Sequence, residues 1–293
     1  MTLTDRAAPA PAPPQSAEAV YDAEEARRAR AIRTEGIARW LLPLLVVIAT
    51  IAGWQWLVTA NDIPHYILPG PLRVWEQLVT DWPLLRDALF VTLKITVMAL
   101  GVAVVGGVLL AILFDQSRFA ELIFYPYAVI LQVTPIVSIA PLIFIYVKDP
   151  TARVLICAWI VAFFPLLSNT SLGLKSTDHN LRDLFAIYGA SRWQRLIFLK
   201  LPSALPYFLG GLRIAGGLAL IGAIVAEYVV GTGGAGSGLA FRILEASYRL
   251  NIPRMFAALL LIGVVGVAIF ALTALLSHLM LRKWHESAIR REG

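Results

Sequence analysis

Charged residues are scarce in this chain, and so are the signatures of soluble enzymes. Only 15% of its 293 residues are Asp, Glu, Lys or Arg, whereas 58% are hydrophobic. An average soluble domain is about 25% charged and about 45–50% apolar. Mean hydropathy is correspondingly high, at +0.73. This balance argues against a soluble enzyme and predicts a protein that crosses a membrane several times.

Cysteine and catalytic motifs are equally sparse. The single cysteine, Cys157, excludes an internal disulfide framework, and its apolar neighbours predict simple packing. Three patterns are absent: Gly-x-x-x-x-Gly-Lys-Ser/Thr for nucleotides, His-Glu-x-x-His for zinc and Gly-x-Ser-x-Gly for hydrolysis. The four histidines lie in different segments. We therefore expect no catalytic residue, no metal site and no cofactor in this chain.

One glycine-rich stretch, residues 231–236, formally matches the dinucleotide-binding pattern Gly-x-Gly-x-x-Gly. It follows an apolar run instead of a strand, and no acidic residue stands in the required strand–helix–strand context. We expect a flexible turn on the outer side of the membrane.

Six apolar runs are long enough to cross a bilayer, which takes about 20 residues at about 1.5 Å each. The third run contains Pro126, Pro135 and Pro141, which predict kinks or breaks. Only residues 148–150 separate it from the fourth, which predicts a tight helical hairpin. The predicted fold class is an all-α polytopic membrane protein whose six transmembrane helices cover roughly residues 40–60, 91–114, 121–147, 152–172, 206–230 and 255–281.

The two ends of the chain differ from the spans. Residues 1–36 are rich in proline and alanine and then in charge, which predicts a disordered, charged segment. The first apolar run exceeds the hydrophobic region of a signal peptide, so we expect no cleavable one. We place the transmembrane domain at residues 37–285 and a tail at 286–293.

Lysine and arginine predict the orientation. With the N-terminus inside, 16 of them fall on the cytoplasmic side and 7 on the outer side, leaving out Lys94 and Arg213 within spans. Cytoplasmic loops carry such an excess, so both termini are expected in the cytoplasm. The same excess accounts for the net charge of +6, which therefore gives no indication of nucleic-acid binding.

The polar stretch between the fourth and fifth spans reads as two short helices, the elbow 178–202. Asp178 is a candidate N-cap, and Gly189 is the residue type expected just after a helix end. Ser191 and Gln194 have the spacing of a capping box that starts a second helix, and Pro202 is expected to end it. Such a pair could lie on lipid headgroups or dock to a soluble partner. A rigid elbow joined directly to the fifth span favours docking, because it would transmit motion into the membrane helices.

The elbow resembles the signature of permease subunits of bacterial ATP-binding-cassette importers. That signature reads Glu-Ala-Ala, three residues, Gly, nine residues, Ile-x-Leu-Pro; here the glycine is Gly189, and residues 199–202 read Leu-Lys-Leu-Pro. Asp-Leu-Phe replaces Glu-Ala-Ala. The resemblance implies that the residues coupling this chain to an ATPase are Asp183, Leu184, Phe185, Gly189, Ala190, Ser191, Leu201 and Pro202.

Further similarities cover roughly residues 37 to 285 and are closest to the nitrate, sulfonate and taurine branch of these permeases. They include residues 67–71, reading Ile-Leu-Pro-Gly-Pro, residues 211–215, reading Gly-Leu-Arg-Ile-Ala, Ala226-Glu227 and residues 282–284, reading Arg-Lys-Trp. The branch also contains permeases for pyrimidine and riboflavin-type vitamin precursors.

The fifth run carries a strip of small residues spaced four apart: Gly211, Ala215, Ala219 and Ala223. Small residues allow two membrane helices to approach closely, and a similar strip in the second run marks that run as the partner. Alanine and glycine are also simply common in membrane helices. Arg213 and Glu227 lie in the fifth run, where ionisable groups are costly and need partners. We expect Arg213 to snorkel or bond the elbow, and Glu227 to form a gate contact near the outer end.

The resemblance implies an importer permease of the bacterial inner membrane that works as a homodimer. Two ATPase subunits, which hold the ATP and magnesium, would dock on the elbow, and a periplasmic binding protein would deliver the solute. A sulfonate, taurine or nitrate is the first expectation, and a vitamin precursor is the alternative. An ion-coupled secondary transporter is a rival, although it calls for inverted repeats and paired intramembrane carboxylates. An intramembrane enzyme would need convergent catalytic groups, which the sequence does not supply.

Overall fold

The computed structural model describes residues 41–230 and 236–282. The predicted segment 1–36, most of the glycine-rich turn and the tail 286–293 therefore lie outside the described residues. The described part of the chain is helical and contains no strand. It divides into two compact units at residues 63 and 64. The first unit contributes one described apolar helix, Leu41–Ala60, which matches the first predicted span.

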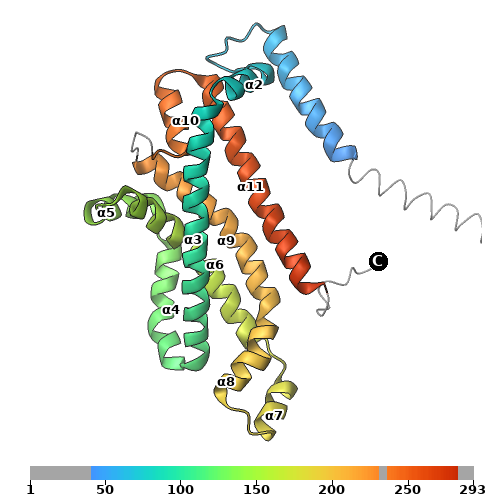
Figure 1. Cartoon of the computed structure of the whole chain (residues 1–293), viewed down its shortest axis with the longest axis vertical. Helices are drawn as coiled ribbons and strands as arrows, with labels where there is room; N and C mark the ends of the chain where they lie inside the picture. Colours follow the sequence, from blue (N-terminus) through green and yellow to red (C-terminus); the bar gives the residue numbers. More distant parts are fainter. Residues whose placement is uncertain (1–40, 231–235, 283–293) are drawn as a thin grey trace, which may run out of the picture. The chain divides into compact units, whose positions relative to one another are not determined.

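The second unit places two short helices at one end and the elbow at the other, with long helices between (Figure 1). Its elements are α2 (Pro71–Thr80), α3 (Trp82–Gln116), α4 (Arg118–Val133), α5 (Ile136–Tyr146), α6 (Pro150–Lys175), α7 (His179–Ile187), α8 (Arg192–Arg195), a π-helical turn (Leu196–Lys200), α9 (Leu201–Val230), α10 (Leu239–Tyr248) and α11 (Ile252–Leu281).

Five of the described helices are long and apolar enough to cross a membrane, and a bent pair makes a sixth if it counts as one span. The five are Leu41–Ala60, α3, α6, the continuous helix Arg192–Val229 and α11. The apolar runs therefore located the spans, although several helices extend beyond them. The helix α3 begins nine residues before the run at 91, because Arg86 and Asp87 interrupt the apolar run without ending the helix. Pro83 lies in its first turn.

The third predicted span is broken. Between its two halves, α4 and α5, the helix axis bends by 105°. Thr134 and Pro135 between them have extended backbone, as expected where proline disfavours the helical conformation of the residue before it. The other two prolines, Pro126 and Pro141, lie inside α4 and α5. The break that the prolines predicted is therefore present, and it occurs at only one of them.

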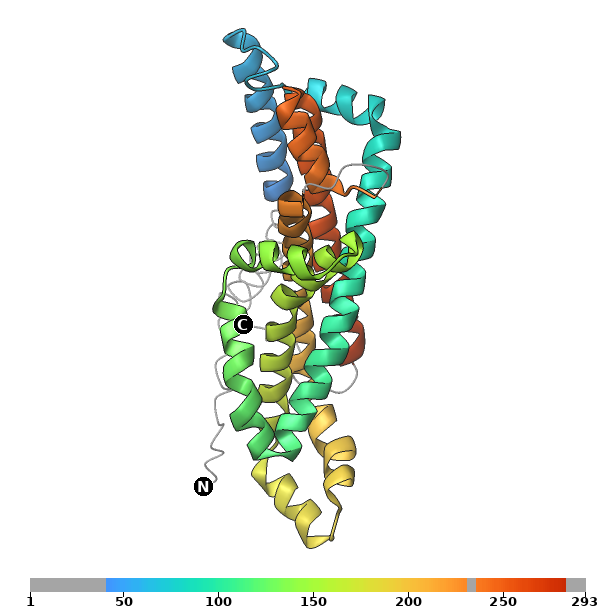
Figure 2. The same ribbon diagram turned by 90° about the vertical axis from the view of Figure 1, so that its left-hand side faces the viewer.

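The expected tight hairpin between the third and fourth spans is wrong in its geometry. Residues 147–149 do join α5 to α6 directly. However, α5 lies across the direction of α6 instead of alongside it (Figure 2). The bend at Pro135 is the reason, since it turns α5 out of the direction of α4.

The short helices α2 and α10 were not predicted, because both lie outside the long apolar runs. They are amphipathic and bury a few side chains each, such as Val74 and Leu78 of α2 and Leu239 and Ala246 of α10. The core of the unit lies lower, where α6 is packed between α3 and α9.

Candidate functional site

The elbow begins with α7, which has the predicted cap. The side chain of Asp178 accepts a hydrogen bond from the backbone N–H of Asn180 at 2.7 Å. The helix ends at Ile187, and Gly189, two residues later, has a φ of +66° in the left-handed region. The N–H of Ala190 then donates to the carbonyl of Phe185 at 2.9 Å and closes the turn. A side chain at Gly189 would meet no atom within 4 Å, so backbone conformation, and not space, favours glycine there.

The second helix starts with the predicted capping box. The Ser191 hydroxyl accepts from the N–H of Gln194 at 3.2 Å, and the Gln194 amide oxygen accepts from the N–H of Ser191 at 2.7 Å. Both short helices of the elbow are thus fixed by their own side chains.

Pro202 does not end the second helix, contrary to the prediction. The chain runs on as a continuous helix from Arg192 to Val229. The turn just before the proline, Leu196–Lys200, is π-helical, and the N–H of Leu201 bonds the carbonyl of Leu196 five residues back. This wider turn admits a residue that lacks an N–H, as π-bulges commonly do. Leu201 and Pro202 are therefore the first residues of α9 and not a boundary.

The surface of α7 is apolar and uncovered. None of its residues is buried, and Leu181, Leu184, Ile187 and Tyr188 are exposed. Asp183 is also exposed, whereas Phe185 and Ala190 are half-buried at the inner side of the turn. An amphipathic helix with an uncovered apolar face can bind a complementary groove on a partner.

The strip of small residues on α9 is buried, as predicted. Ala215, Ala219 and Ala223 are fully inaccessible to solvent. A Cβ at Gly211 would lie 2.9 Å from the Cβ of Asn169 and 3.0 Å from a carbonyl of α6. One at Gly222 would lie 2.9 Å from the Cα of Ala158, also on α6. The backbones of α6 and α9 are therefore in close contact.

The prediction that α3 packs against this strip was incomplete. The helix α3 does contact α9, but α6 lies between much of the two and is the main partner of both. A Cβ at Gly107 of α3 would lie 3.0 Å from Leu166 of α6. The strip on α3 thus faces α6, which offers its own small residues, Ala158 and Ala162, among larger ones.

Within the described residues Arg213 makes no hydrogen bond or ion pair with the elbow, and its snorkelling stays a prediction. Its guanidinium lies over the ring of Phe270 on α11, 5.5 Å from the ring centre. A cation above an aromatic face is attracted by the ring quadrupole, more strongly where water is excluded. Arg213 therefore links α9 to α11.

Glu227 caps another helix. Its carboxylate accepts from the hydroxyl of Thr92 on α3 at 2.9 Å and from the N–H of Ala240 at 3.2 Å. The Thr92 oxygen accepts from the N–H of Leu239 at 2.9 Å. The first two amides of α10, which have no partner within their own helix, are satisfied by side chains of α9 and α3. Gly238 is needed here, because a Cβ would overlap the carboxylate.

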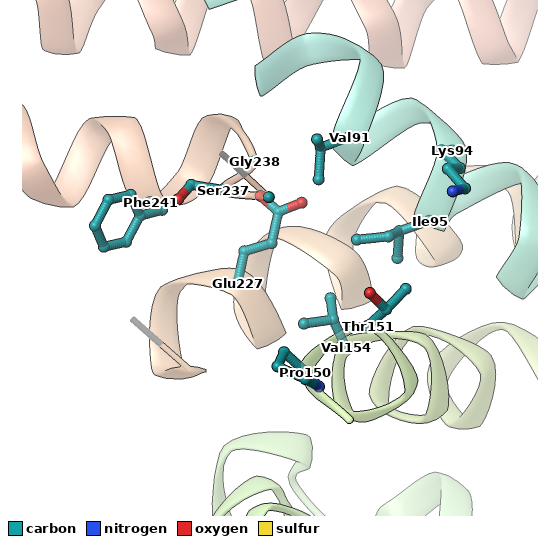
Figure 3. A pocket seen from close by; sticks show the side chains of 11 residues that line it. Val91, Lys94, Ile95, Pro150, Thr151, Val154, Glu227, Ser237, Gly238 and Phe241 are labelled. Atoms are coloured by element: carbon teal, nitrogen blue, oxygen red, sulfur yellow. The ribbon is translucent and has the colours of Figure 1, made fainter. Parts of the chain in front are cut away.

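A cavity of about 400 Å³ adjoins this cap. Figure 3 shows Glu227 reaching from α9 towards Ser237 and Gly238, with Val91 and Ile95 of α3 and Val154 of α6 along the walls. Lys94 lies at the edge of the cavity. Glu227 thus lies near the end of α9 that is remote from the elbow, and it links α9 to α3 and α10 there. Its role as a gate contact stays a prediction.

The described residues contain no group of three or more His, Cys, Asp or Glu side chains placed to hold a metal ion. The functional geometry consists of helix caps, close helix packing and an uncovered elbow.

Comparison with known proteins gives a consistent family. The family described as "Binding-protein-dependent transport system inner membrane component" matches residues 103–282. A "Probable ABC transporter permease protein" of Haemophilus influenzae is 34% identical over 79% of this chain and 93% of its own length. The "Formylaminopyrimidine transport permease protein ThiX" of Halalkalibacterium halodurans is 32% identical over 82% of this chain and 95% of its own length. The "Putative aliphatic sulfonates transport permease protein SsuC" of Bacillus subtilis is 28% identical over 85% of this chain and 89% of its own length.

The fold is also found among solved structures. One of them is titled "Crystal structure of an amino acid ABC transporter with histidines", and it superposes with a TM-score of 0.58 at 19% identity. The match covers 68% of this chain and 95% of that one.

Proposed function

This chain belongs to the family of inner membrane components of binding-protein-dependent transport systems, and from that premise we propose that it forms the solute path of an ATP-driven importer. Its relatives are permease subunits of ATP-binding-cassette transporters, which are not enzymes, since a separate ATPase carries out ATP hydrolysis. It is a multi-pass protein of the inner membrane.

The observation that carries the coupling proposal is the uncovered apolar face of α7. Exposed leucine, isoleucine and tyrosine side chains in water are costly, and a soluble partner would cover them. We assign the elbow 178–202 as the docking site of the ATPase. Asp183 and Leu184 lie on its exposed surface, and Gly189, Ala190 and Ser191 set the angle between α7 and α8.

The mechanism follows from the continuity of the helix Arg192–Val229. ATP binding, with magnesium on the partner, closes the two ATPases and draws the elbows together. Each elbow is the start of a helix that also carries Glu227 at its other end. Its displacement therefore rotates α9 and the tightly packed α6 as one body. Solute binding and ATP binding then select between inward-open and outward-open arrangements, and this chain contributes no catalytic residue.

We further propose a homodimer with six spans per chain, α4 and α5 together making the third. Both termini lie in the cytoplasm, as the distribution of lysine and arginine indicates. A periplasmic binding protein docks at the opposite end of the unit from the elbow, where α2 and α10 lie (Figure 1).

The solute is a small molecule released by that binding protein. An aliphatic sulfonate, taurine or nitrate fits the branch to which the relative from B. subtilis belongs. A heterocyclic vitamin precursor is the second candidate. It is supported by the relative named for formylaminopyrimidine, which is more similar in sequence to this chain than the relative from B. subtilis is. Lys94 is the one cationic side chain among the residues that line the cavity beside Glu227, so this cavity offers no dense cluster of positive charge for an anion.

Uptake into proteoliposomes tests the proposal. The chain is reconstituted with the ATPase and binding protein encoded beside it, and a radiolabelled ligand of that binding protein is supplied outside. ATP enclosed in the vesicles should drive accumulation without an ion gradient. Accumulation that ignores ATP and collapses with the proton gradient would instead identify a secondary transporter.

A further inference from the structure

A strongly basic pocket of about 340 Å³ lies where α3 turns into α4 and meets the second helix of the elbow. Four of its six lining side chains are cationic and one is anionic. The uncovered face of α7, which carries the coupling proposal, contributes none of these side chains. The lining residues are Asp115, Gln116, Arg118, Arg192, Arg195 and Lys200.

The one carboxylate of the pocket is already satisfied. Asp115 has a side chain only 6% exposed, and it pairs with Lys200 at 2.7 Å. It also accepts a hydrogen bond from Gln116 at 2.9 Å. The neighbouring carboxylate on the first turn of α4, Glu121, pairs with Lys175. Both nearby anions are thus neutralised by lysines.

The three arginines keep their charge for another ligand. Within the described residues, none of them lies within ion-pair distance of a carboxylate. Arg195 is held in place, because its Nε donates to the carbonyl of Ala190 at 3.1 Å. Three arginines lining one pocket give it a positive potential that an anion would neutralise.

The residues around this pocket have features expected at a membrane surface. It lies at the last residues of α3, where an apolar helix of 35 residues ends. Large aromatic side chains next to it are exposed, namely Phe119, Trp193 and Phe198. Tryptophan is enriched at the level of lipid headgroups, and aromatic side chains exposed beside a span can contact acyl chains.

We propose that this pocket binds the phosphate group of an anionic phospholipid, held by Arg118, Arg192 and Arg195. Guanidinium groups match phosphate oxygens with paired hydrogen bonds, and basic pockets between membrane helices bind anionic headgroups. Asp115 and Lys200 join α3 to the start of α9 beneath the pocket. A bound phosphate ties the α3–α4 corner to α8 and makes the elbow sensitive to lipid composition.

Lipid preference tests the proposal. The purified protein is mixed in mild detergent with phosphatidylglycerol or phosphatidylcholine, and bound lipids are counted by native mass spectrometry. We expect a clear preference for phosphatidylglycerol. Replacing all three arginines with glutamine should lower that preference by about tenfold or more, since each basic residue near an anionic surface contributes about fivefold. The matched control replaces three exposed arginines at the other end of the unit, Arg73, Arg86 and Arg249, and should keep the preference.

Hydrogen exchange on the wild-type protein gives a second readout that needs no variant. Amides of residues 115–118 and 191–195 should exchange more slowly in nanodiscs containing phosphatidylglycerol than in phosphatidylcholine alone. Inorganic phosphate added at the same concentration should not reproduce this protection. Equal protection by inorganic phosphate would identify a soluble anion as the ligand and overturn the lipid assignment.

Two other outcomes also overturn it. One is a triple variant that keeps the wild-type preference. The other is a triple variant that keeps the preference but no longer co-purifies with the ATPase, which would make the pocket a protein-docking surface. ATP-driven uptake is measured on the wild-type chain, so the lipid site and the importer function are tested separately.

Discussion

The hydroxyl of Thr92 donates to the carboxylate of Glu227, and its oxygen also accepts the first amide of α10. Residues 135 positions apart in sequence therefore meet at a buried point where three helices join. The arrangement links α10 to the ends of α3 and α9 that lie remote from the elbow.

Thr92→Val removes both the donor and the acceptor while preserving side-chain shape. It leaves the N–H of Leu239 without a partner and weakens the cap of α10, at a cost of about 1–3 kcal/mol. We expect a lower melting temperature in detergent and faster hydrogen exchange in α10. Thr92→Ser, which keeps the hydroxyl, is the control and should stay near wild type. Equal behaviour of the two variants would contradict the role of this hydroxyl.

The close packing of α9 on α6 predicts different effects of substitution at two glycines of α9. A Cβ at Gly222 would lie 2.9 Å from the backbone Cα of Ala158, whereas one at Gly217 would meet nothing within 4 Å. Gly222→Ala should therefore destabilise the protein by about 1–3 kcal/mol, because a backbone atom cannot give way easily.

Gly217→Ala provides the control. It should be neutral or stabilising by up to about 1 kcal/mol, since alanine favours helix. Thermal unfolding of both variants in one detergent measures the difference. A Gly222→Ala protein as stable as Gly217→Ala would show that the two helices do not approach so closely.

The turn of the elbow depends on the positive φ of Gly189. Gly189→Pro cannot adopt φ of +66° and lacks the N–H that bonds Ala186 at 3.0 Å. It should leave the membrane helices folded and abolish ATP-dependent uptake. Gly189→Asn should retain most uptake, because asparagine tolerates the left-handed conformation. Normal uptake by the proline variant would remove the elbow from the coupling mechanism.

A cluster of charged side chains around Glu245 lies on and beside α10, at the end of the unit remote from the elbow, and acidic pH tests its contribution. The hydrogen bond from Arg242 lowers the pKa of Glu245 against the effect of burial, and the charges of Arg242, Arg249 and Arg254 lower it further. A group with a lowered pKa in the folded state stabilises above its unfolded pKa, which is about 4.3 for glutamate. That stabilisation is lost as the pH falls through the lower, folded value.

We therefore expect the α10 amides of the wild-type protein to exchange faster below about pH 4.3 than at neutral pH, after correction for the intrinsic exchange rate. Glu245→Gln should reduce this pH dependence, because the glutamine does not titrate. A pH dependence unchanged by the substitution would assign it to other groups.

Local features of the elbow were predictable because they depend on neighbouring residues. Asp178 caps α7, Ser191 and Gln194 form the capping box, and Gly189 adopts positive φ, all within a few residues of sequence. The spans were predictable for a similar reason, since about 20 apolar residues in a row identify each one.

Other features depend on contacts that sequence spacing does not contain. Pro126, Pro135 and Pro141 look alike in sequence, yet the helix breaks only at Pro135. Pro202 was expected to end a helix, but the π-helical turn before it lets the helix continue. The bond between Thr92 and Glu227 had no sequence signal, because α3 and α9 are brought together only by folding.

The composition of the intact complex tests the importer account most directly. The chain is tagged, co-expressed with the genes beside it, extracted in mild detergent and measured by native mass spectrometry. The account predicts two copies of this chain bound to two copies of an ATPase, and loss of the ATPase when Leu184 and Tyr188 on the uncovered face of α7 are both replaced by aspartate. A chain that stays alone or self-associates, in a preparation where the ATPase is expressed and folded, would contradict it.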